Sequence, residues 1–100
     1  MATTTDAVKI LKQRVGGVPD FDERVAVDKL NVRVAMLIYH ARTESGITQA
    51  ELARRVGTSQ PNIARLEDAD YQGHSLSMLQ RIAVALGKQI EIQMVDVEAA

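Results

Sequence analysis

The chain of 100 residues contains no cysteine and no tryptophan, and it has only one phenylalanine and two prolines. Without cysteine it forms neither a disulfide framework nor a thiolate metal site, which fits a reducing compartment. Lysine and arginine number 12 and aspartate and glutamate number 13, so the chain as a whole is no general polyanion binder. Any contact with nucleic acid must therefore come from a local cluster of side chains.

Long apolar runs are also missing. No run approaches the roughly 18 residues that span a bilayer, and the opening MATTTDAVKILK lacks the apolar core of a secretory signal. We therefore expect a cytoplasmic protein.

Catalytic and metal-binding patterns are equally scarce. The sequence has no nucleophile with an evident base, no Gly-rich phosphate loop and no paired carboxylates on a pocket-like background. Its two histidines, His40 and His74, lie far apart and have no spaced carboxylates beside them. We expect no enzyme, no metal and no cofactor.

The length and the 46% hydrophobic content predict a single compact domain. The pattern divides the chain into an N-terminal arm over 1–19, a helical domain over 20–87, and a C-terminal strand and tail over 88–100. The arm has a weak helical spacing and ends at GGVP, which breaks a helix. A frayed terminus explains the arm equally well.

Capping signals predict four helices in the domain. Asp20 followed by Glu23 begins a long helix that ends near Gly46, and Thr48 followed by Glu51 begins a short one that Gly57 stops. Thr58 and Ser59 cap the next, and Ser75 or Ser77 begins the last. One apolar stripe follows the long helix: Val27, Leu30, Val34, Leu37, Ile38 and Ala41. The last helix is expected to bury Leu76, Leu79, Ile82, Ala83 and Leu86.

After Gly87 the spacing of apolar residues changes from that of a helix to every second residue. In KQIEIQMV the apolar residues Ile90, Ile92 and Met94 fall on one side, as in a β-strand. A lone strand leaves backbone groups unpaired, so it needs a partner strand. The simplest partner is the same strand of a second copy across a twofold axis, which predicts a homodimer.

Two short helices around a Gly-containing turn, the second with a polar outward face, form a helix-turn-helix unit. The second helix carries Gln60, Asn62 and Arg65. Gln and Asn bond bidentately to adenine and Arg to guanine, so the three together indicate a surface that enters the major groove. The alternative is an ordinary solvated helix face.

The stretch TQAELARRVGTSQPNIARLE, residues 48–67, resembles the helix-turn-helix of the phage repressor and Cro family, also called the xenobiotic-response-element type. SLSMLQRIAVALG resembles that family's final core helix. The resemblance implies an all-α, lambda-repressor-like domain of four or five helices, here with one C-terminal β-strand. It also implies binding to double-stranded operator DNA as a dimer.

Carried over by position, the resemblance implies that Gln49 contacts a phosphate and Gln60 reads a base edge. Arg65 would reach a base or a phosphate, and Asn62 would face the backbone or the groove wall. The expected DNA-contacting residues are Gln49, Thr58, Ser59, Gln60, Asn62 and Arg65.

Other positions are expected to act through the fold. Pro61 departs from members that carry a second polar reader there, so one base contact is missing or is replaced by apolar contact with a thymine methyl group. Arg42 and Glu67 match a pair that forms a structural salt bridge in such repressors.

A narrower resemblance covers more of the chain. A helical arm, a long first helix, the helix-turn-helix and an IEIQM strand are similar to the small HigA-type antitoxins. That resemblance implies a repressor of its own operon that also neutralises a small toxin protein. The alternatives are a stand-alone phage-type regulator and a helix-turn-helix used as a protein-interaction module that does not bind DNA.

Overall fold

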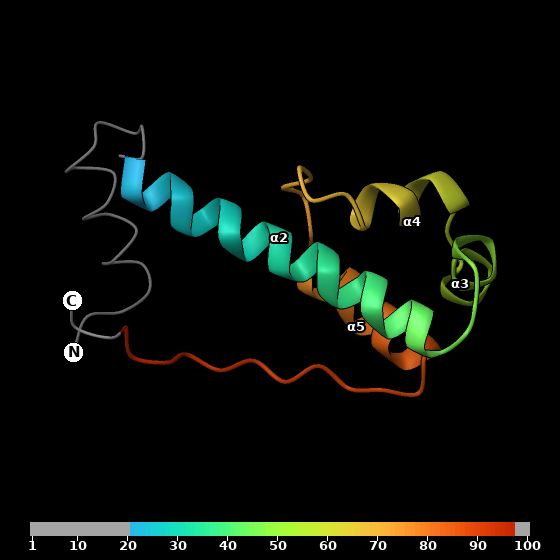
Figure 1. Ribbon diagram of the computed structural model, residues 1–100. Coiled ribbons are helices and arrows are strands. Elements are labelled where there is room, and N and C mark those ends of the chain that lie inside the picture. The colour runs from blue at the N-terminus through green and yellow to red at the C-terminus, as the bar shows by residue number, and fades with distance from the viewer. Residues whose placement is uncertain (1–20, 98–100) are drawn as a thin grey trace.

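The computed structural model describes residues 21–97, which form four helices. These are α2 (Phe21–Glu44), α3 (Gln49–Val56), α4 (Gln60–Leu66) and α5 (Leu76–Ala85). The three short helices gather around the C-terminal half of α2, and its N-terminal half extends beyond them (Figure 1). This confirms the predicted all-α class, while the predicted arm, 1–19, lies outside the described residues.

The helix starts follow the capping residues that the sequence predicts. The hydroxyl of Thr48 accepts a hydrogen bond from the backbone N–H of Glu51, and the hydroxyl of Ser59 accepts one from Asn62. Ser75 caps α5 in the same way, which decides between the two predicted serines. Each bond satisfies an N–H group that has no partner within its own helix.

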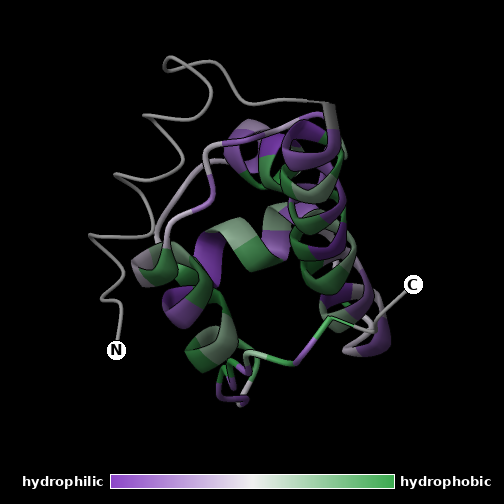
Figure 2. Cartoon of the chain, turned by 90° about the vertical axis from the view of Figure 1, so that its left-hand side faces the viewer, coloured by the Kyte–Doolittle hydropathy of each residue, from purple (hydrophilic) through white to green (hydrophobic). Residues whose placement is uncertain are grey.

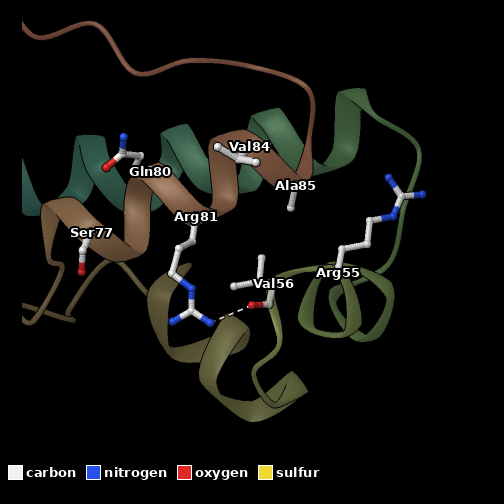
Figure 3. A pocket seen from close by; sticks show the side chains of 7 residues that line it. All are labelled: Arg55, Val56, Ser77, Gln80, Arg81, Val84 and Ala85. Atoms are coloured by element: carbon white, nitrogen blue, oxygen red, sulfur yellow. Dashed lines mark hydrogen bonds between the residues drawn. The ribbon is translucent and has the colours of Figure 1, made fainter.

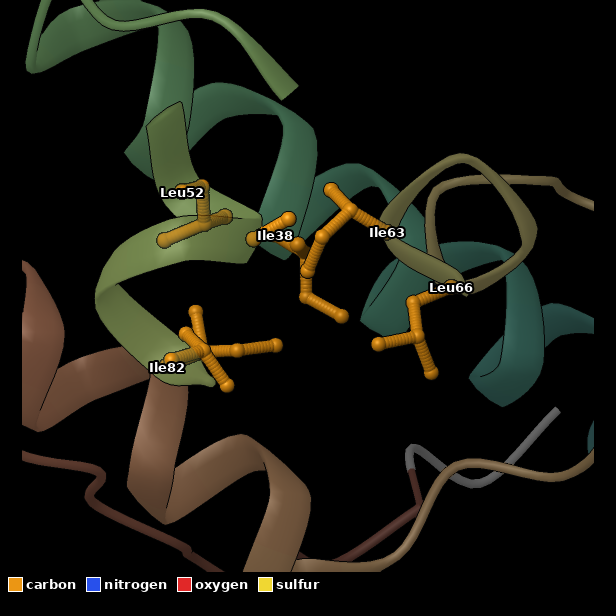
Figure 4. Close-up of a cluster of buried hydrophobic side chains, with 7 residues drawn as sticks. Ile38, Leu52, Ile63, Leu66 and Ile82 are labelled. Carbon is orange, nitrogen blue, oxygen red and sulfur yellow. The ribbon is translucent and has the colours of Figure 1, made fainter. Parts of the chain in front are cut away.

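The core is small and takes one or two large side chains from every helix. Ile38, Leu52 and Ile63 are the largest fully buried residues, and they come from α2, α3 and α4. Ala53, Val56, Leu66 and Ile82 complete the cluster that Figure 4 shows converging between the helices. Because all four helices share this cluster, it fixes the position of α3 and α4 relative to α2.

The apolar stripe on α2 is only partly buried. Ile38 is 2% exposed, but Val27 is 52%, Leu30 61% and Leu37 53% exposed. Figure 2 shows hydrophobic and hydrophilic residues interleaved along the length of α2. Val27 and Leu30 stay uncovered because no described helix packs against the protruding half of α2 (Figure 1), and Leu37 faces an open groove between α2, α5 and residues 90–93.

Leu76 also differs from the expectation of a core residue, since it is 64% exposed. It is the first residue of α5 and lines the same open groove as Leu30 and Leu37. A helix pattern predicts which residues share a face, but the neighbouring elements decide whether that face is covered.

The C-terminal segment 88–97 leaves α5 and runs back past α2 without forming a strand in the single described chain (Figure 1). Ile90 is half-buried, and Ile92 and Met94 are exposed. No backbone hydrogen bond joins residues 89–97 to any other described residue. A β-ladder requires a second strand, so the predicted pairing of this segment with a second copy stays a prediction.

Candidate nucleic-acid interface

The turn between α3 and α4 is fixed by its backbone and by a side chain from α5. Gly57 has φ +83° and donates its N–H to the carbonyl of Ala53 at 2.9 Å. Figure 3 shows Arg81 reaching from α5 to donate to the carbonyl of Val56, the last residue of α3, at 2.7 Å. The direction in which α4 leaves the turn is therefore held from both sides.

A largely buried ion pair fixes the other end of α4. Arg42 at the end of α2 donates to both carboxylate oxygens of Glu67, from Nε at 2.7 Å and from a terminal nitrogen at 3.0 Å. The two side chains are only 11% and 4% exposed. The hydrogen bond from Arg42 to Glu67 raises the pKa of Arg42 above its usual value. A third bond, from Arg42 to the carbonyl of Ile47, ties the pair to the loop before α3.

The Glu67 carboxylate also begins a relay of side-chain hydrogen bonds that leads to the exposed start of α4. Gln49, the first residue of α3, donates from Nε2 to Glu67 Oε1 at 3.0 Å. Its own Oε1 then accepts from Nε2 of Gln60, the first residue of α4, at 2.7 Å. Because an amide nitrogen has two N–H groups, Gln60 keeps one donor and its carbonyl oxygen for a ligand. Gln60 is exposed, so this donor and acceptor pair is held in place at the surface.

Three of the expected DNA-contacting residues have roles within the turn. Asn62 donates from its side-chain amide to the hydroxyl of Thr58 at 2.9 Å, and both residues are half-buried. Ser59 is the N-cap of α4. These contacts brace the first turn of the helix that carries Gln60.

Arg65 has a different environment. It lies in the last turn of α4 and is exposed, and its guanidinium forms no hydrogen bond or ion pair with any other described residue. The structure thus places the hydrogen-bonded amide of Gln60 at the start of α4 and the unpaired guanidinium of Arg65 near its end.

Comparison with known proteins decides the family. The helix-turn-helix family model matches residues 38–93, from Ile38 in α2 to the middle of the C-terminal segment. The chain belongs to the helix-turn-helix family. This confirms the helix-turn-helix that the sequence predicts at 48–67.

Two relatives illustrate the membership. The chain is 38% identical to "Antitoxin HicB" of Escherichia coli (strain K12) over 66 residues, which is 66% of this chain and 47% of that protein. It is 47% identical over 53 residues to an "Uncharacterized HTH-type transcriptional regulator" of Methanothermobacter thermautotrophicus, covering 53% of this chain and 75% of that protein. The chain therefore spans about half the length of its HicB relative. No solved structure matches it.

Within this helix-turn-helix, the charges on α3 are largely paired. Glu51 accepts from Arg54 at 2.6 and 2.9 Å and from Arg55 at 3.0 Å. These hydrogen bonds from Arg54 and then Arg55 lower the pKa of Glu51 to about 2. Both arginines are thus partly neutralised, while Arg65 is not.

Sequence reasoning missed two residues that support the helix-turn-helix. Arg81 holds the turn through Val56, and His74 contacts the carbonyl of Leu66 through Nε2 at 2.7 Å. Because a carbonyl only accepts, His74 Nε2 carries the proton in this contact. Neither residue belongs to a local motif, and only the packing of the loop and α5 brings them to the unit.

The described part of the chain, 21–97, offers no group of three or more His, Asp or Glu side chains placed to hold a metal. Among the same residues, none of the helices combines the length and the hydrophobicity that spanning a bilayer requires.

Proposed function

We propose that this protein is a transcriptional regulator that binds double-stranded operator DNA, with α4 in the major groove. The observation that carries the proposal is the relay from Arg42 through Glu67 and Gln49 to Gln60. It uses a largely buried ion pair to hold an exposed amide at the first residue of α4. Arrangements held before binding lose less conformational entropy when the ligand arrives.

The free groups suit base edges. Gln60 retains one N–H donor and one acceptor, the pair that recognises N7 and the N6 amino group of adenine. Arg65 is the unpaired cation of α4 and suits guanine or a phosphate. Gln49, half-buried beside Gln60, suits a contact with the flanking phosphate. One relative bears the name of a transcriptional regulator, which supports this function.

We further propose that the regulator acts as a homodimer. The two α4 helices would then lie one duplex turn apart, about 34 Å, and enter successive major grooves of an operator. The C-terminal segments, with Ile90, Ile92 and Met94, would pair across the twofold axis. Repression follows if the operator overlaps the promoter of the protein's own gene.

The test is competition binding. A labelled duplex from upstream of the protein's own gene is titrated with the full chain, and unlabelled random duplex competes at the same salt concentration. The proposal expects the upstream duplex to be retained against excess random DNA. Equal competition by both duplexes would refute sequence-specific binding and favour a protein-interaction module.

Substitution of Arg65 sharpens this test. Arg65→Ala should weaken binding to the specific duplex by about 1–3 kcal/mol, while circular dichroism shows an unchanged fold. Arg24→Ala is the matched control, because Arg24 is also exposed but lies on the protruding half of α2. An equal loss on random DNA would show that Arg65 contacts phosphate only.

A second role is proposed from the other relative. HicB is named an antitoxin, and the chain matches about half of it. We propose that this protein also binds and neutralises a small toxin encoded beside its gene. Co-expression should restore growth to cells that produce the neighbouring gene's product, and the two proteins should copurify. If the neighbouring gene's product does not inhibit growth, the toxin role is refuted and the function that remains is that of a stand-alone regulator.

A further inference from the structure

An exposed apolar surface lies away from the α3–α4 unit. It combines three residues of α2 with one of α5 and one of the C-terminal segment, each more than half exposed: Val27, Leu30, Leu37, Leu76 and Ile92. Four of the five line a single groove of about 470 Å³ between α2, the start of α5 and residues 90–93. Scattered exposed apolar residues are ordinary, but a contiguous set of this kind marks an interaction surface.

The spacing on α2 indicates what such a surface fits. Positions 27, 30, 34, 37 and 41 are separated alternately by three and four residues, the heptad spacing by which a helix packs along its length against another element. Within one chain, Val34 packs against the core cluster, and Leu37 and Ala41 lie beside α5 and the start of the C-terminal segment. Val27 and Leu30 stay more than half exposed.

The C-terminal segment supplies the opposite half of the groove. Ile90 and Ile92 line it, and the backbone of residues 89–97 is not hydrogen-bonded to any other described residue. The groove thus presents both apolar side chains and an unpaired backbone edge. An added strand satisfies both at once.

Opposite charges flank the groove. Arg33 on α2 and Glu91 on the segment both line it and both are exposed. Neither side chain forms an ion pair or a hydrogen bond with another described residue. A surface with one free cation and one free anion on its two sides is complementary to itself under a twofold rotation.

We propose that a second copy of this chain occupies the groove. In this arrangement the two C-terminal segments pair antiparallel over the α2 helices, and Arg33 of each copy faces Glu91 of the other. This deepens the proposed homodimer, on which it rests, by making the protruding half of α2 part of the interface. The α3–α4 unit lies at the other end of the domain (Figure 1), so the interface leaves Gln60 and Arg65 free.

Charge reversal tests the contact between copies. Arg33→Glu and Glu91→Arg each place two like-charged pairs in the twofold interface, so each variant alone should dimerise at least about tenfold more weakly. When the two variants are mixed, both contacts of the heterodimer are again between opposite charges. Sedimentation should show dimers in the mixture at a concentration where each variant alone is monomeric. A mixture no more dimeric than its components would overturn the proposal.

A second pair of variants tests the apolar face. Leu30→Asp should shift the full-length protein to monomer, because it buries a charge in the interface. Val32→Asp is the matched control, since residue 32 lies on the opposite side of the helix and carries the same new charge. Circular dichroism establishes that both fold. Equal behaviour of the two, or a wild-type protein that sediments as a monomer, would overturn the proposal.

Binding to a single half-site separates these outcomes from failure of DNA recognition. Monomeric variants should still bind a half-site duplex with wild-type affinity, because α4 is not in the groove. Loss of dimerisation with half-site binding intact would locate the interface without touching the DNA-binding proposal.

Discussion

Gln60 on α4 donates a hydrogen bond to Gln49 on α3 at 2.7 Å, so the first residues of the two helices of the helix-turn-helix unit are joined by their side chains. Gln49 is itself held by Glu67. The orientation of Gln60 therefore depends on a residue that need not touch a base.

This dependence predicts coupling between the two glutamines. Gln49→Ala should weaken specific DNA binding by about 1 kcal/mol or more, because Gln60 loses its support as well as any phosphate contact of Gln49. Gln60→Ala is the second single variant. The Gln49→Ala/Gln60→Ala double variant should lose less binding free energy than the sum of the two single losses, by about 0.5 kcal/mol or more. Titrating the specific duplex with the wild type, the two single variants and the double variant measures this coupling, with Gln80→Ala as a control on α5. Additive losses would show that the two amides act independently.

Glu67 is predicted to be the most sensitive charged position in the unit. Glu67→Gln removes the counter-charge of a guanidinium that is 11% exposed and should lower the free energy of unfolding by about 1–3 kcal/mol. Glu44→Gln, at the exposed end of α2, should change it by less than about 0.5 kcal/mol. Urea unfolding of the two variants provides the comparison. Similar stabilities would mean that the ion pair contributes little to the fold.

Gly57 is predicted to be required for its backbone conformation. At φ +83° an alanine would be strained, and its Cβ would meet Arg81 only at an ordinary contact distance of 3.6 Å. Gly57→Ala should therefore cost about 1–2 kcal/mol through the backbone alone. Gly57→Asn should cost less, because Asn tolerates the left-handed region better. If thermal unfolding shows Gly57→Asn to be less stable than Gly57→Ala, side-chain packing and not backbone conformation determines the cost of substitution at this position.

The ion pairs of Glu51 on α3 predict that the fold loses stability at acid pH. The pKa of Glu51 is lowered to about 2 from 4.5, so the folded state binds this proton less readily than the unfolded state. The stabilisation is complete above about pH 4.5 and is lost as the pH falls toward 2. An NMR titration of the Glu51 carboxyl carbon should show a midpoint near 2 in the wild type. Arg54→Ala should move that midpoint upward, and an unmoved midpoint would contradict the assigned cause.

The sequence predicts the local features of this fold well because their causes are local. Thr48, Ser59 and Gly57 act within one turn of chain, and each ends or begins a helix where the pattern indicates. Burial is different, because it depends on distant elements. The stripe on α2 predicts one face correctly, yet Leu30 is 61% exposed since nothing described covers it.

The support for the candidate interface shows the same limit. Gln49 and Gln60 are each visible in the sequence, but their hydrogen bond spans 11 positions and depends on the angle between α3 and α4. Arg81 lies 25 positions from the carbonyl that it holds, and no motif marks it. Contacts of this kind follow from tertiary packing.

The most direct test of the central claim is an NMR titration of the labelled protein with a half-site duplex from its own upstream region. The claim that α4 reads DNA predicts the largest amide shifts at Gln49 and along 59–65, and smaller, salt-sensitive shifts with random duplex. Shifts confined to the protruding half of α2 and the C-terminal segment, or identical shifts with both duplexes, would contradict it.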